Sequence, residues 1–274
     1  MGPGLKYHVI TIAAIFFALT IGLVVGSLIV SPRVADRQQR AIGRLQTTLN
    51  QDNISLHQQL KRWEDFGGRI SPVLLKGRLA NTSVCIIQTG DYPDALARVK
   101  EALQLADARI PLTLTMGRAF DRPDDVLNRA LAALHTANPL MPADRASVAE
   151  ALASAIDQGK TKPEDLFTRL EETQVLQAEV ENTLGGGAAH LVVLVAGSRL
   201  ENDTRPAQVD QPLIEALQKH GLIVVMCEPQ EVISSDAENY RRLGINVPTI
   251  VGIDSDIGRC DLILRLGGTL GGTP

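Results

Sequence analysis

Aromatic and cysteine side chains are both scarce in this chain of 274 residues. Phe, Trp and Tyr make up only 3% of it, so the core of any folded domain must be built from aliphatic side chains. The three cysteines, Cys85, Cys227 and Cys260, form no CxxC pair and show no metal-ligand spacing. This odd, low number argues against a disulfide scaffold, but it does not indicate in which redox compartment the protein works.

An excess of basic residues is missing as well. The chain has 27 Lys and Arg residues against 31 Asp and Glu residues, which gives a formal net charge of −4. No basic patch with interleaved aromatic residues occurs. We therefore expect no nucleic-acid partner.

The common signatures of cofactor binding and catalysis are also absent. Neither GxGxxG nor GxxxxGK[ST] occurs, and no GxSxG surrounds Ser198. Two pairs of acids, Asp91 with Asp94 and Glu201 with Asp203, follow predicted strands. Loop solvation and helix capping explain these acids better than catalysis does. We expect no catalytic residue, no cofactor and no enzymatic activity.

The longest apolar segment is "VITIAAIFFALTIGLVVGSLIV", residues 9–30, in which 22 consecutive residues carry no charge. At about 1.5 Å per residue, a helix of this length spans roughly 33 Å, enough to cross a hydrocarbon core of about 30 Å. A cleavable secretory signal has a shorter apolar region followed by a small-x-small site. We therefore expect residues 1–8 to be a short tail and residues 9–30 to be an uncleaved transmembrane helix, with a cleaved signal as the alternative.

Small residues recur at every fourth position of this segment, at Ala14, Ala18, Gly22 and Gly26. Residues four apart share one face of a helix. "GLVVG" also matches GxxxG, a pattern that lets two helices approach closely in lipid. The segment thus predicts helix pairing, although Gly and Ala are frequent enough in such helices for the match to be accidental.

Residues 33–66 carry apolar side chains at heptad spacing, a pattern typical of a parallel two-stranded coiled-coil stalk. Polar residues at three of the second heptad positions weaken such a stalk but can specify its register. The alternative is an amphipathic helix packed on its own domain. With the membrane helix, the stalk predicts a homodimer whose interface contains Ala14, Ala18, Gly22, Gly26, Ile42, Leu45, Leu49, Leu56 and Trp63.

Beyond the stalk, apolar runs alternate with amphipathic segments. "SVCIIQTG", "HLVVLVAGS" and "LIVVMCEP" are typical of buried parallel strands, and "PDALARVKEALQLAD" and "QPLIEALQKHG" predict helices. Residues 124–184 are expected to be largely helical. We expect an α/β domain with a parallel sheet at residues 80–266, built from two similar strand–helix–strand half-units, and a glycine-rich tail at residues 267–274.

Sulfur ligands suit copper(I), and Met226 and Cys227 are adjacent at the end of a predicted strand. They are therefore the candidate metal ligands of the chain. Neighbouring residues of a strand point to opposite faces, however, so we do not expect these two side chains to share an ion. The five histidines are scattered along the sequence.

Both ends of the chain resemble the MctB family of copper transport proteins. The apolar segment fits the family pattern H-x-x-(S/T)-(I/L)-A-A-(I/V)-F-x-A-L-x-x-G-x-x-x-G-S, and "VLLKGRLANTSVCIIQTGD" fits its entry into the first strand. Near the C-terminus, "PTIVGIDSDIGRCDLILRL" is similar to a family segment, although Gly252 replaces an acidic residue. The matching residues are His8, Ala13, Ala14, Phe16, Ala18, Leu19, Gly22, Gly26, Ser27, Leu75, Gly77, Val84, Ile86, Thr249, Val251, Asp254, Gly258 and Arg259.

The resemblance implies a cell-membrane protein of the envelope with one span, a coiled coil and an α/β domain outside the cytoplasm, associated with copper homeostasis. It implies copper as a possible ion without identifying a ligand. The arginines contradict this location, because Arg33, Arg37, Arg40 and Arg44 follow the span and favour a cytoplasmic domain. Two functions stay open: a dimeric copper-homeostasis protein, and a non-enzymatic scaffold or regulator for another cell-envelope or cell-wall protein.

Overall fold

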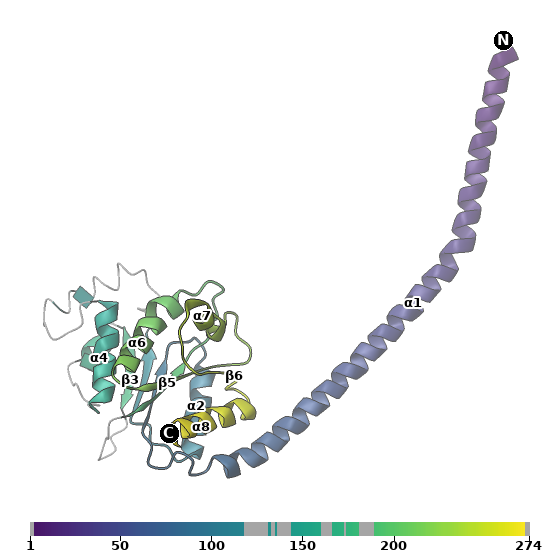
Figure 1. The fold of residues 1–274 in the computed structure, drawn as a ribbon. Helices are drawn as coiled ribbons and strands as arrows, with labels where there is room; N and C mark the ends of the chain where they lie inside the picture. The colour runs from purple at the N-terminus through teal and green to yellow at the C-terminus, as the bar shows by residue number, and fades with distance from the viewer. Residues whose placement is uncertain are drawn as a thin grey trace. The chain divides into compact units, whose positions relative to one another are not determined.

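The computed structural model contains two compact units, Met1–Trp63 and Glu64–Pro274. The first belongs to one long helix, α1 (Pro3–Leu75), which ends inside the second unit (Figure 1). The second unit is an α/β domain. The structure describes residues 3–117, 131–132, 135, 144–159, 166–172, 174–180 and 189–271.

The first unit contains the predicted apolar segment. Within the described residues, one helical stretch, Tyr7–Gly26, is long and apolar enough to cross a membrane. None of its side chains is buried inside the protein. The helix continues without a break through the predicted stalk and beyond it, to Leu75. The coiled coil itself stays a prediction, because one chain does not show its partner.

The second unit is built on a six-stranded sheet in the order β3-β2-β1-β4-β5-β6. All neighbouring strands are parallel except β3, which is antiparallel to β2. The predicted α/β class with a mostly parallel sheet is therefore confirmed, whereas the two half-units stay a prediction. The strands are β1 (Val84–Gln88), β2 (Leu112–Met116), β3 (Leu176–Val180), β4 (Leu191–Val195), β5 (Ile223–Glu228) and β6 (Thr249–Val251).

Two aliphatic cores cover the two faces of this sheet. Residues of β1 alternate between them: Cys85 and Ile87 enter one core, and Val84 and Ile86 enter the other. The first core includes α4 (Arg145–Asp157), α5 (Leu166–Glu172), α6 (Gln211–Lys219) and α7 (Asp236–Leu243). The second includes α2 (Pro93–Leu105), α8 (Asp256–Gly271) and the end of α1, so helices lie on both sides of the sheet (Figure 1).

One sequence prediction is corrected by these elements, whereas the domain bounds, with an α/β domain at residues 80–266 and a tail at residues 267–274, stay predictions. Strand β3 lies in the stretch predicted to be helical. The prediction failed because β3 is an edge strand of only five residues, too short for its alternation of more and less buried positions to stand out in the sequence. Helix α8 extends through Gly267 and Gly268 of the predicted tail, since Leu262, Ile263 and Leu266 anchor it in the core. The compact unit also starts before residue 80, because the end of α1 packs into it. Much of the predicted helical stretch 124–184 lies outside the described residues.

Candidate functional site

A cluster of polar side chains lies where β1 and β4 end. The chain leaves β1 toward β2 on one side and leaves β4 toward β5 on the other, so the strand order reverses between these two central strands. In open α/β sheets, ligands bind at such a switch point, outside the carboxyl ends of the strands. The loops that follow β1 and β4 are therefore the first place to look for a binding site.

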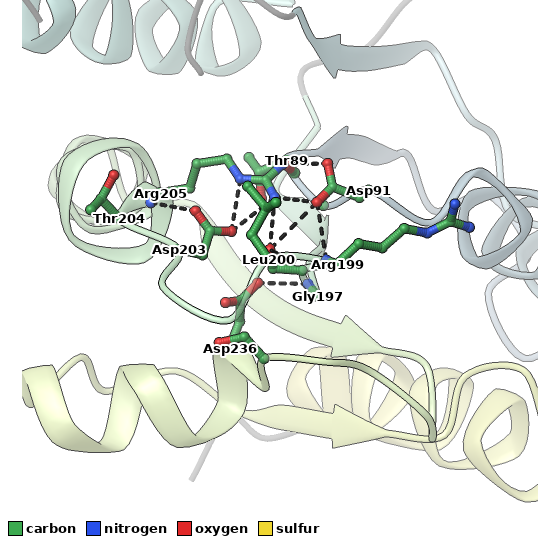
Figure 2. Close-up of polar contacts among 12 residues, drawn as sticks. Thr89, Asp91, Gly197, Arg199, Leu200, Asp203, Thr204, Arg205 and Asp236 are labelled. Atoms are coloured by element: carbon green, nitrogen blue, oxygen red, sulfur yellow. Dashed lines mark hydrogen bonds and ion pairs between the residues drawn. The ribbon is translucent and has the colours of Figure 1, made fainter. Parts of the chain in front are cut away.

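Arg205 occupies this position. It is almost completely buried at the start of a short π-helical turn, η2 (Pro206–Asp210), which leads into α6. Its Nη1 donates to the Thr89 carbonyl at 2.9 Å and to Asp91 Oδ1 at 2.8 Å, its Nη2 donates to Asp91 Oδ2 and to Ser198 Oγ, and its Nε donates to Asp203 Oδ2 at 2.8 Å. A guanidinium carries five N–H groups, and five hydrogen bonds leave this one (Figure 2).

The charges of this network stabilise one another. Partial burial disfavours the ionised carboxyl of Asp91, but hydrogen bonds from Arg205 and from the Arg199 backbone N–H hold its pKa below the usual range. The two carboxylates in turn raise the pKa of Arg205 further above its ordinary value, although its burial opposes this. Asp91 and Arg205 therefore both stay charged near neutral pH.

The backbones of the two loops also touch directly. A Cβ placed on Gly90 would lie 2.5 Å from the carbonyl carbon of Ala196 and 2.7 Å from the carbonyl oxygen of Gly197. Only a residue without a side chain fits between these groups. The close approach and Arg205 fill the switch point with the protein's own atoms. The arrangement is suited to tying β1 and β4 together and not to cradling a phosphate.

A second set of acids stabilises the N-terminus of α7. The buried Glu228, at the end of β5, accepts hydrogen bonds from Ser235 Oγ at 2.6 Å and from the Asp236 backbone N–H at 2.8 Å. Asp236 accepts one from the Gly197 backbone N–H at 2.6 Å (Figure 2). Carboxylates at a helix N-terminus satisfy free N–H groups and complement the helix dipole. These contacts join α7 to the loop after β4.

Asp210 is the most strongly perturbed acid of the domain. It is buried and accepts a hydrogen bond from the Tyr240 hydroxyl at 2.7 Å. Burial, followed by the nearby charge of Asp236, raises the pKa of Asp210 to about 7. Burial also raises the pKa of Asp236 to about 6. Because both folded-state values lie above the ordinary value of about 3.9, these two acids make the folded domain less stable as the pH rises from about 4 to about 7.

Met226 and Cys227, the predicted candidate metal ligands, do not form a site. Both side chains are completely buried, and they belong to opposite cores, as expected for neighbours in a strand. Burial, followed by the charge of Glu228, raises the pKa of Cys227, which disfavours the thiolate that binds metals. Nowhere in the described part of the chain do three His, Cys, Asp or Glu residues gather into a group able to hold a metal ion.

The predicted dimer residues all lie on α1, and their side chains are exposed. Apart from the neighbouring residues and the backbone of the helix itself, nothing lies within 4 Å of the position that a Cβ would take at Gly22 or Gly26. The large apolar residues of the predicted interface are each more than half exposed: Ile42, Leu45, Leu49, Leu56 and Trp63. The surface needed for pairing is therefore exposed to solvent in a single chain.

Sequence reasoning missed the Arg205 network. Asp91 and Asp203 were interpreted as solvated loop residues, but both pair with Arg205. The short spacing of Asp203 and Arg205 was the available signal, whereas Asp91 lies more than a hundred residues away and only folding brings it near.

Comparison with known protein families gives a match that covers almost the whole chain. A family model described as "copper transport outer membrane protein, MctB" matches residues 4–274. The chain belongs to the MctB family. No curated protein matches it. The MctB assignment makes this chain a copper transport-related envelope protein, and it confirms the resemblance seen at both ends of the sequence.

Proposed function

We propose that this MctB protein works in copper homeostasis as a single-pass homodimer, in which α1 anchors two chains in the membrane and pairs them. The observation that supports this is the continuity of α1, in which an apolar span leads directly into a stripe of exposed apolar residues. Complete burial of one Leu or Ile side chain contributes about 1.5–3 kcal/mol. Burial of several such side chains along one stripe therefore favours the binding of a second helix.

The geometry of α1 favours parallel pairing. Both chains enter the membrane at the same end of the helix, and the small-residue face of the span follows the same spacing in both. In the stalk, Ile42, Leu49, Leu56 and Trp63 occupy one heptad position, where each meets its own counterpart in a parallel dimer.

For the α/β domain we propose a non-enzymatic role. Arg205 fills its switch point. Its buried acids accept hydrogen bonds from the Gly197 backbone N–H and from the hydroxyls of Ser235 and Tyr240. A single helix satisfies its own backbone polar groups but encloses no channel, so one span cannot itself form a pore. We therefore propose that the domain lies outside the cytoplasm and acts on copper through contact with other envelope proteins.

Pairing is tested by cysteine cross-linking of the full chain in membranes. Leu49→Cys, in the stripe, should form a disulfide-linked dimer, whereas Thr47→Cys, on the outer face of the same helix, should not. Equal cross-linking of both variants, or none in either, would contradict the dimer. All variants carry Cys260→Ser, because the other two cysteines are buried.

The role in copper homeostasis is tested in cells that lack the protein. The full chain should restore their normal copper content and copper tolerance, and Leu49→Pro, which breaks the stalk, should not. A normal copper content in cells lacking the chain would refute this role. It would favour the second candidate, a scaffold for a cell-wall protein, which the exposed stalk supports equally.

The side of the membrane is tested with Arg241→Cys, an exposed position of α7, and a thiol reagent that does not cross membranes. Labelling in intact cells places the domain outside the cytoplasm. Labelling only after lysis would mean that the arginines following the span decide the topology.

A further inference from the structure

Only one face of the C-terminal part of α1 contacts the rest of the α/β domain. A Cβ on Gly67 would lie 2.7 Å from Asp256 Cβ, and Ser71 Oγ lies 3.3 Å from Cys260 Sγ. One turn later, Leu75 is completely buried in the core. Because the two contacts advance in the same direction on both helices, the end of α1 runs alongside the first turns of α8.

The apolar face of this part of α1 does not take part in that contact. Phe66 and Val73 are 49% and 79% exposed, and Ile70 lies between them on the same side of the helix. Helical periodicity puts Gly67 and Ser71 between this face and the buried Leu75. The domain therefore contacts α1 through Gly67, Ser71 and Leu75 and leaves much of Phe66 and Val73 exposed.

Helix α8 adds apolar side chains beside the same contact. Asp256 and Cys260 face α1, and Leu262 points into the core. On α8, the contact with α1 lies between the side that faces the core and the side that carries Ile257 and Leu264. These two side chains are 71% and 48% exposed. We call the surface formed by Phe66, Ile70, Val73, Leu74, Ile257 and Leu264 the α1/α8 patch.

We propose that the α1/α8 patch is where the α/β domains of two copies of this chain meet, side by side, in the dimer. This inference rests on the proposed pairing of α1. The heptad register indicates that the partner at this patch is a second copy of the chain. Ile70 continues the heptad position of Trp63, and Phe66 and Val73 continue that of Leu45. A second copy that pairs along the stalk reaches the patch in register without any break in α1.

The charges beside the stripe agree with a parallel second copy. Arg62 and Arg69 lie seven residues apart on one side of it, and Leu60 and Leu74 lie on the other. In a parallel pair these two sides face each other, so the basic side chains lie over uncharged residues and do not oppose one another.

The first experiment is cross-linking of the full chain in membranes, again in the Cys260→Ser background. We expect Val73→Cys to form a dimer as efficiently as Leu49→Cys, whereas Asp65→Cys, exposed on the outer face of the same helix, should not. If Leu49→Cys cross-links and Val73→Cys behaves like Asp65→Cys, the domains do not meet and this inference is wrong, while the dimer stands. If neither cross-links, the proposed pairing itself fails.

The second experiment tests α8. Ile257→Glu should weaken dimerisation of the full chain in detergent by about tenfold, because a charge replaces an apolar contact. Ile233→Glu is the matched control, since Ile233 is also exposed, at 62%, but lies outside the patch. Equal dimer affinity of the two variants would mean that the second copy does not cover the α8 side of the patch, and would overturn the proposal there.

Discussion

Replacing Arg205 by Ala tests whether the switch point is held together by its charges. The substitution removes the cation between Asp91 and Asp203 together with five hydrogen bonds, three of which go to the oxygens of these two carboxylates. Loss of one partner of a buried ion pair costs about 3–5 kcal/mol. The Asp91 side chain is 29% exposed, so water compensates part of this loss and we expect about 3 kcal/mol.

For a domain of this size, about 1 kcal/mol lowers the melting temperature by about 2–4 °C, so Arg205→Ala should lower it by about 6–12 °C. The buried thiols of Cys85 and Cys227 provide the assay in the Cys260→Ser background, because they become reactive only when the sheet opens. Labelling of these thiols is followed as the full chain is heated. Arg205→Lys should give an intermediate loss, since an ammonium keeps the charge but cannot reach all the acceptors.

Arg199→Ala is the matched control. Arg199 lies on the same loop, but it is exposed and stacks on the Tyr92 ring at 4.9 Å from its centroid, a contact worth at most about 1 kcal/mol. If Arg205→Ala lowers the melting temperature no more than Arg199→Ala does, the network does not hold β1 and β4 together. The switch point would then be free to open for a ligand.

Three further outcomes are expected. Asp210→Asn should reduce the fall in melting temperature between pH 5 and pH 8, because the wild-type acid, with a pKa of about 7, resists the ionisation that unfolding permits; an unchanged fall would assign it to other groups. Gly90→Ala should destabilise the domain by about 3 kcal/mol in the same thiol assay, because its Cβ would meet the Gly197 backbone; wild-type stability would refute that contact. Gly22→Ile with Gly26→Ile should lower energy transfer between labelled chains in vesicles, with no clash inside one chain; unchanged transfer would exclude this face from the dimer.

The strands and the membrane segment could be predicted because their signals are local. An uninterrupted apolar run predicts a span, and the short runs around β1, β4 and β5 are aliphatic throughout because both faces of a central strand are covered. Strand β3 escaped prediction because an edge strand is half exposed and its five residues lie close to helical segments. The last turns of α1 escaped because Gly67, Gly68 and Pro72 are typical of a helix end, whereas contact with α8 keeps them helical.

Spacing along the chain is enough to predict the class of the domain, the apolar span, the heptad stripe and the family. The order of the strands, the burial of Met226 and Cys227 in opposite cores, and the use of Arg205 to fill the switch point became known only from the folded domain. These features depend on residues that are far apart in sequence, such as Asp91 and Arg205. A buried charge or a close backbone contact becomes visible only when folding brings its partners together.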